Sequence, residues 1–367
     1  MLFPIRRSTW WHASIGLLAL VLSHTASAPV HATPYDARDP ATWSAWQLAG
    51  QLTVSCVELD DVADAKRQAA AGIGGITLLG SRAPGNLAAQ LAAADRRAPH
   101  GIAPFVMSDE EGGRVQRLQS AIYRLPSANT MGGWQASRVR ATAREYGVRM
   151  RRLGVRMNLA PVADLSVRGS YMAELHRTFS SNPDAVARTS RAWRLGMHDA
   201  GVVTVLKHWP GHGSAVNSHD GPASVPPLRS LERRDMLPFN LELSRGARVV
   251  MVGHLTSRGL TERGMPASES PRALRYLRAK AGNDAVIITD SLTMAAASSS
   301  LGITPARAAV RSLRAGADWA LVCNERPLRA VGTIRDAIAT GRLPRARAVE
   351  SAQRIVRLKM QYGVASG

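Results

Sequence analysis

Cysteine, lysine and aromatic residues are scarce in this sequence. The 367 residues include two cysteines, and aromatic residues make up 5% of the chain. Two cysteines far apart in sequence cannot by themselves supply the four ligands of a structural zinc site. A nucleic-acid-binding protein usually gathers its basic residues and alternates them with aromatic ones. Here the arginines are scattered, so we expect no nucleic-acid partner.

Three common catalytic motifs are also missing. The chain has no HExxH zinc-protease motif, no G-x-S-x-G nucleophile elbow and no GxxxxGK[ST] phosphate loop. A zinc site built from His208, His212 and His219 was the remaining metal alternative. Pro210 and the neighbouring glycines prevent the helix on which histidines four residues apart share a face. The sequence therefore predicts no metal ion.

No long apolar run follows the N-terminal region, so we expect no transmembrane segment in the mature chain. The N-terminus itself is typical of a secretory signal. Arg6 and Arg7 form a basic region, Ile15–Leu22 a short apolar region, and Val30-His31-Ala32 a cleavage site. We therefore predict a signal peptide over residues 1–32 and a catalytic domain over residues 33–367. The mature chain would be exported and extracellular, periplasmic or associated with the cell wall.

Arginine supplies nearly all of the formal net charge of +20, because the chain contains only four lysines. Removal of Arg6 and Arg7 with the signal peptide leaves about +18. A strongly basic exported protein suits anionic cell-wall polymers as partners. Nothing in the sequence indicates oligomerisation, so we expect a monomer.

Cys56 and Cys323 both lie in apolar segments. The preferred interpretation is two separate small apolar side chains in strands. A disulfide is the alternative, because an exported chain permits one and the first and last strands of a barrel are neighbours.

Apolar segments alternate with alanine- and arginine-rich helical segments through most of the chain. Eight such alternations predict a single (β/α)8 TIM-like barrel, with a doubly wound open sheet as the alternative. The expected helices include Thr42–Gln51, Asp61–Gly72, Ala136–Leu153, Pro183–Ala200, Pro271–Ala281 and Pro305–Gly316. The expected strands are Leu52–Val57, Gly75–Leu79, Ala103–Ser108, Met157–Pro161, Val202–Lys207, Val249–Gly253, Ala285–Asp290 and Trp319–Cys323.

Polar residues follow many of these strands and favour the barrel, whose sites lie at the carboxyl ends of its strands. The strand ends carry Asp109-Glu110-Glu111, Asn158 and Asp164, Lys207-His208, His254 and Asp290. The segment after Ser108 also holds Arg114 and Arg117, which would share a face if it were helical. Asp290 has a simpler alternative, the N-cap of a helix starting near Leu292.

Six stretches together resemble glycoside hydrolase family 3, in its single-domain β-N-acetylglucosaminidase (NagZ-type) branch. They are SDEEGGRVQRL, MNLAPVADL, RTFSSNP, KHWPGHG followed by NSH, MVGHLT and ITDSLTM. They occur in the family's order and cover roughly Leu48 to Tyr362. The resemblance implies removal of terminal β-linked N-acetylglucosamine from peptidoglycan or muropeptide fragments, with retention of configuration and without a metal or organic cofactor.

The resemblance also implies the roles of individual residues. Asp290 corresponds to the nucleophile and His219 to the general acid/base. The residues that correspond to the sugar-binding set are Asp109, Arg117, Arg177, Lys207 and His208.

Asn217 departs from the family, whose loop reads Asp-Ser-His where this chain has Asn217-Ser218-His219. A neutral amide does not stabilise the imidazolium that forms when His219 takes a proton, whereas Asp220 could bend back towards it. Two alternatives to the hydrolase follow. One is a phosphorylase, because histidine tolerates phosphate better than a carboxylate does. The other is a cell-wall sugar-binding protein that has lost turnover.

Overall fold

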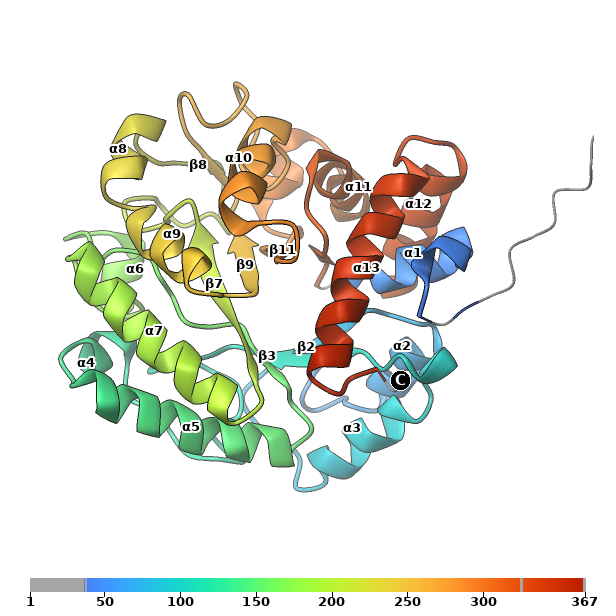
Figure 1. The fold of residues 1–367 in the computed structure, drawn as a ribbon, viewed down its shortest axis with the longest axis horizontal. Coiled ribbons are helices and arrows are strands. Elements are labelled where there is room, and N and C mark those ends of the chain that lie inside the picture. The colour runs from blue at the N-terminus through green and yellow to red at the C-terminus, as the bar shows by residue number, and fades with distance from the viewer. Residues whose placement is uncertain (1–35, 37, 324–325, 366–367) are drawn as a thin grey trace, which may run out of the picture. The chain divides into compact units, whose positions relative to one another are not determined.

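Eight parallel strands form the central sheet of the computed structural model, which describes residues 36, 38–323 and 326–365 (Figure 1). The predicted signal peptide, residues 1–32, lies outside the described residues. The strands are β1 (Thr53–Glu58), β2 (Gly75–Leu79), β3 (Phe105–Ser108), β6 (Met157–Asn158), β7 (Val203–Trp209), β9 (Val249–Val252), β11 (Val286–Thr289) and β12 (Ala320–Leu321).

The strands follow one another around the sheet in chain order, and β12 pairs with β1 through Thr53 and Ala320. A bridge between Ile288 and Trp319 joins β11 to the residue before β12. The sheet therefore returns to its starting strand, whereas a doubly wound sheet reverses its order and keeps two edges. The TIM-like barrel is confirmed, and the open-sheet alternative was wrong.

Helices in the connections cover the outside of the barrel, and α5 and α7 lie side by side (Figure 1). Short 3-10 helices lie at Pro40–Thr42, Pro99–Gly101, Ala295–Ala297 and Ser299–Leu301. The α-helices are α1 (Ala45–Gln51), α2 (Asp64–Ala70), α3 (Leu87–Asp95), α4 (Ala128–Gly132), α5 (Ala136–Arg152), α6 (Tyr171–Glu174), α7 (Pro183–Asp199), α8 (Leu228–Arg233), α9 (Leu237–Ser244), α10 (Pro271–Ala281), α11 (Pro305–Ala315), α12 (Pro327–Ala339) and α13 (Arg345–Gln361).

Local capping sets several of these boundaries. Before α10, the Ser270 hydroxyl accepts a hydrogen bond from the Ala273 N–H at 3.0 Å, and Pro271 occupies the first turn. Gly282 ends the same helix with a φ of 79°, which a residue with a Cβ rarely adopts. The predicted bounds of this helix are therefore correct.

The structure decides three local alternatives that the sequence left open. The segment with Arg114 and Arg117 is not helical, because β4 (Glu110–Gly112) and β5 (Val115–Gln116) form an antiparallel hairpin there. No α-helix starts near Leu292; the chain forms two 3-10 turns between 295 and 301. Cys56 and Cys323 are joined in a disulfide with their Cα atoms 4.9 Å apart, so they are not separate thiols.

A second small pairing joins β8 (Ala223–Ser224) to β10 (Leu255–Thr256) in parallel. It connects the loop after β7 to the loop after β9. Among the described residues, no helix has both the length and the apolar character needed to cross a bilayer.

Candidate active site

One cavity of about 690 Å³ opens at the carboxyl ends of the barrel strands. Its walls come from the loops after β3, β6, β7 and β11. These loops meet because the carboxyl ends of parallel strands lie at the same end of a barrel. All eight residues selected from the sequence line it: Asp109, Arg117, Arg177, Lys207, His208, Asn217, His219 and Asp290.

A buried cluster of two cations and two carboxylates forms one wall. The Lys207 ammonium donates to Asp109 Oδ1 at 2.6 Å and contacts Glu111 Oε1 at 2.7 Å. The Arg177 guanidinium donates to both oxygens of Glu111, each at 2.8 Å. Burial acts to raise the pKa of Glu111, but Arg177 and Lys207 outweigh it and hold the pKa well below its ordinary value. Glu111 is therefore ionised and holds both cations in place.

The β4–β5 hairpin carries Arg117 to the same cavity. The buried Nε of Arg117 has no hydrogen-bond partner within the described part of the chain. The backbone N–H of Arg117 donates to Glu110 Oε1 at 3.2 Å. Tyr146 donates its hydroxyl to the other oxygen of Glu110 at 2.7 Å, so α5 holds the hairpin from behind. An unpartnered guanidinium N–H beside a cavity is suited to a hydroxyl or carbonyl of a ligand.

Asp164 fixes the start of the loop after β7. One of its oxygens accepts from the backbone N–H groups of His208 at 3.1 Å and His212 at 2.8 Å. The other lies 2.7 Å from Nδ1 of the His208 ring. This carboxylate is fully buried, and it sets both the backbone of the loop and the orientation of the His208 ring.

Asp290 lies directly after β11, where it lines the cavity. Its Oδ1 accepts from the Ser291 N–H at 2.8 Å. Burial acts to raise the pKa of Asp290, but His208, His254 and the Ser291 N–H together lower it to about 2. The carboxylate is therefore ionised at neutral pH and available as a nucleophile.

His254 supports this strand end from behind. Its Nδ1 lies 2.8 Å from Ser268 Oγ, and its Nε2 lies 2.9 Å from the carbonyl oxygen of Ser291. Burial lowers the pKa of His254 below its ordinary value. The contact between Nε2 and this carbonyl holds the backbone beside Asp290.

The loop that carries His219 is attached to the segment after Asp290. The carbonyl oxygens of Ser218 and His219 accept from the N–H groups of Ala296 at 3.3 Å and Ala295 at 3.2 Å. The His219 side chain is exposed and lines the cavity. These two hydrogen bonds connect the acid/base candidate to the element that follows the nucleophile candidate.

The Asn217 side chain forms hydrogen bonds with two residues of the same loop, His219 and Asp220. Its Oδ1 accepts from the His219 N–H at 3.2 Å, and its Nδ2 donates to Asp220 Oδ2 at 2.7 Å. Ser218 is buried, and its Oγ lies 3.1 Å from Nε2 of His212. The Asn217 amide therefore holds the Asp220 carboxylate by a hydrogen bond.

The sequence does not indicate that Glu111 pairs with Arg177 and Lys207, or that His212 contacts Asp164 and Ser218. Glu111 was one of three consecutive acids, and only the fold shows which of them meets Arg177 and Lys207. His212 was considered solely as a metal ligand. Among residues 36, 38–323 and 326–365, no group of three or more histidines, cysteines or acidic residues is placed to hold a metal ion.

Known proteins share this fold and sequence pattern. Residues 49–358 match the model of the "Glycosyl hydrolase family 3 N terminal domain". The β-hexosaminidase LpqI of Mycobacterium tuberculosis is 37% identical over 270 residues, which cover 71% of this chain and 69% of that protein. A β-hexosaminidase of Thiobacillus denitrificans is 38% identical over 60% of this chain and 64% of its own.

Solved structures agree. A family 3 glycosyl hydrolase from Mycobacterium smegmatis superposes with a TM-score of 0.79 at 33% identity, over 90% of this chain and 99% of that one. A family 3 β-N-acetylglucosaminidase from a Paenibacillus species gives a TM-score of 0.81 at 29% identity, over 89% of this chain and 64% of that one. The chain therefore belongs to glycoside hydrolase family 3, and it is a glycoside hydrolase.

Proposed function

We propose that this protein is an exported, retaining β-N-acetylhexosaminidase. It removes terminal β-linked N-acetylglucosamine from peptidoglycan or muropeptide glycans through a covalent glycosyl-enzyme intermediate. The relatives named as β-hexosaminidases and β-N-acetylglucosaminidases support the activity. The N-terminal signal pattern and the net charge of +20 support export and a cell-wall substrate.

The observation that carries this proposal is the ionised Asp290 in a cavity lined by hydrogen-bonding side chains. In the first step, a carboxylate oxygen of Asp290 attacks the anomeric carbon, and the glycosidic C–O bond breaks. Protonated His219 gives its proton to the departing oxygen. The products of this step are a glycosyl ester on Asp290, a neutral His219 and the released aglycone.

The second step reverses these roles. Neutral His219 takes a proton from a water molecule, whose oxygen attacks the anomeric carbon and displaces Asp290. Two inversions at one carbon give net retention. The ionised state of Asp290 serves both steps, because it is a nucleophile in the first and a leaving carboxylate in the second.

The cluster around Glu111 supplies the sugar-binding wall. Asp109 and Lys207 present an acceptor and a donor at the cavity, and the unpartnered Nε of Arg117 offers a further donor. Charge-assisted hydrogen bonds of this kind are stronger than neutral ones and fix the orientation of sugar hydroxyls.

An aryl β-N-acetylglucosaminide tests the activity. The purified protein should release the phenol, and Asp290→Ala should lose nearly all of this activity. Release by the wild type that does not exceed release by the variant would contradict the proposal. A phosphate series in the same assay identifies a phosphorylase, which would be accelerated and would form a sugar 1-phosphate.

A second function, sugar binding without turnover, is favoured by one observation. Within the described residues, no carboxylate is hydrogen-bonded to the His219 ring. The hydrogen bond between Asn217 and His219 involves the backbone N–H of His219 and not its ring. Calorimetry that detects N-acetylglucosamine binding to a wild-type protein without turnover would establish this second function.

A further inference from the structure

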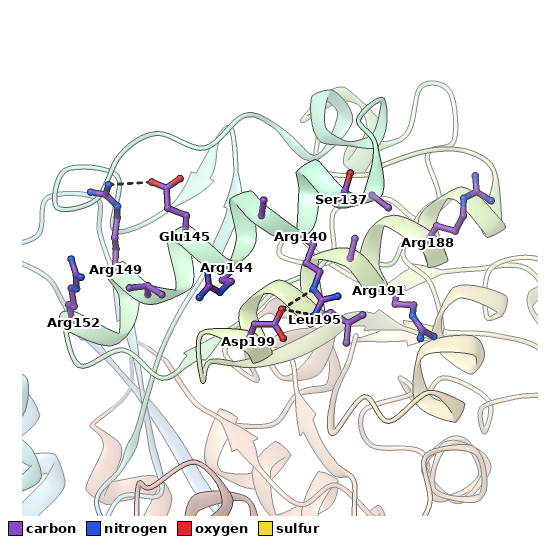
Figure 2. Close-up of a pocket in the computed structure, with 14 residues that line it drawn as sticks. Ser137, Arg140, Arg144, Glu145, Arg149, Arg152, Arg188, Arg191, Leu195 and Asp199 are labelled. Atoms are coloured by element: carbon purple, nitrogen blue, oxygen red, sulfur yellow. Dashed lines mark hydrogen bonds and ion pairs between the residues drawn. The ribbon is translucent and has the colours of Figure 1, made fainter.

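A second cavity lies on the outer wall of the barrel, in a groove between α5 and α7 (Figure 2). Its volume is about 980 Å³, and it shares no lining residue with the candidate active site. Glycines bring the two helices close together. A Cβ at Gly196 would lie 2.2 Å from the Arg140 carbonyl oxygen, so no larger residue fits at this contact. The close approach gathers the outer side chains of both helices along one groove.

Arginine dominates these outer side chains, whereas the inner face of α5 is apolar and buried. Six arginines and two carboxylates line the groove, which leaves four positive charges in excess. The arginines are Arg140, Arg144, Arg149 and Arg152 of α5 and Arg188 and Arg191 of α7.

Four of the six guanidinium groups are exposed and have no ion pair within the part of the chain that the structure describes: Arg144, Arg152, Arg188 and Arg191. The other two arginines are paired with the two carboxylates of the groove itself. Arg140 pairs with Asp199 at 2.8 Å, and Arg149 pairs with Glu145 at 3.2 Å (Figure 2). Both carboxylates of the groove, Asp199 and Glu145, are therefore paired with an arginine of the groove.

Three of the six arginines are arranged along a line on α5, and one of them, Arg140, is already paired with Asp199. Arg140, Arg144 and Arg152 belong to one i, i+4 row of α5, in which Val148 is the fourth member. At about 1.5 Å of rise per residue, this row extends over about 18 Å. A single small anion contacts only part of such a row, whereas a linear polymer with repeated anionic groups contacts all of it. Apolar residues such as Ala141, Ala192 and Leu195 also line the groove and suit the uncharged parts of such a polymer.

We propose that the α5–α7 groove binds a linear polymer that carries carboxylate groups, of the kind found in peptide-substituted cell-wall glycan. The identity of the polymer rests on the proposed function, but the binding of polycarboxylate does not. The lining contains no aromatic residue on which nucleic-acid bases could stack.

Binding of fluorescently labelled poly-L-glutamate to the full chain tests this inference. One variant combines Arg144→Ala, Arg152→Ala, Arg188→Ala and Arg191→Ala. A matched control removes the same charge from exposed arginines on other helices: Arg229→Ala, Arg275→Ala, Arg314→Ala and Arg329→Ala. The groove variant should lose about tenfold or more in affinity relative to the control and show a weaker dependence on salt.

Equal losses in the two variants would overturn the inference, because they would indicate general electrostatic attraction. Tighter groove-dependent binding of inorganic polyphosphate or single-stranded DNA of matched charge would also overturn it, because the preferred anion would then be phosphate. Hydrolysis of an aryl N-acetylglucosaminide should be the same in all three proteins. A wild type that binds polyglutamate without hydrolysing this substrate would support the groove and contradict the proposed function.

Discussion

The amide of Asn217 donates a hydrogen bond to the Asp220 carboxylate at 2.7 Å, three residues along the same loop. The same side chain accepts from the His219 N–H at 3.2 Å. The loop therefore holds in place the carboxylate of the residue that follows His219, although position 217 itself is neutral. We infer that Asp220 supports the charge of the His219 imidazolium and that Asn217 acts as its positioning residue.

The kinetics of Asp220→Asn on two substrates with different leaving groups test this inference. The change removes the negative charge near His219, so proton donation to the departing oxygen should weaken. We expect kcat/KM to fall about tenfold or more for a glycan substrate, whose leaving group needs the proton. The decrease should be small for an aryl glycoside with an acidic phenol. Kinetic measurements on both substrates provide the comparison.

Asn217→Ala is the companion variant. It removes the hydrogen bond that holds Asp220 but leaves the carboxylate, so its effect should be smaller and show the same dependence on the leaving group. Equal losses on both substrates for Asp220→Asn would mean that Asp220 acts on folding or binding and not through His219.

Glu111→Gln should destabilise the protein strongly. Gln cannot balance the charge of Arg177, which would stay buried without a carboxylate partner, and Lys207 would keep only Asp109. Loss of one member of a buried ion pair typically costs about 3–5 kcal/mol. Urea denaturation measures the free energy of unfolding.

The matched control is Glu145→Gln on α5. It breaks an ion pair at 3.2 Å with Arg149 in which both side chains are about half exposed. Exposed pairs contribute about 0–1 kcal/mol, so this variant should resemble the wild type. Similar free energies of unfolding for both variants would contradict the assigned importance of Glu111.

Much of the barrel was predictable, because strand burial and helix capping are local properties. The strand at Gly75–Leu79 and the helix at Pro271–Ala281 have the predicted bounds. The residues at the strand ends could be selected for the same reason, since parallel strands bring their carboxyl ends together.

The interactions between these residues were not predictable, because they join distant parts of the chain. Glu111 meets Arg177, 66 residues later, and the backbone of His208 meets Asp164, 44 residues earlier. The sequence did not distinguish a hairpin after Ser108 from a helix. In the structure Gly112 and Gly113 have φ values of 89° and 63°, which interrupt a helix.

Glu269 should make the free energy of unfolding depend on pH. Burial raises its pKa to about 7 from an ordinary value of 4.5, although Arg311 lies 3.4 Å away and acts in the opposite direction. The folded state then keeps a proton that the unfolded chain has released. The stability from this group is present below pH 4.5 and is lost as the pH rises through about 7.

Thermal unfolding between pH 5 and pH 8 measures this effect. The free energy of unfolding of the wild type should decrease by on the order of 3 kcal/mol over the full range in which Glu269 titrates. Glu269→Gln should lose much less, because its amide does not ionise, whereas the exposed Glu174→Gln should follow the wild type. A Glu269→Gln protein with an unchanged pH profile would show that this carboxyl is ionised in the folded state.

Asp290 is the nucleophile on which the proposed glycosidase activity depends. A fluorinated N-acetylglucosamine analogue that forms the glycosyl-enzyme quickly and releases it slowly tests this role directly. After proteolysis, mass spectrometry should locate the sugar on the peptide that contains Asp290, and Asp290→Ala should remain unlabelled. Labelling of another residue, or no labelling of a wild-type protein that hydrolyses the aryl substrate, would contradict it.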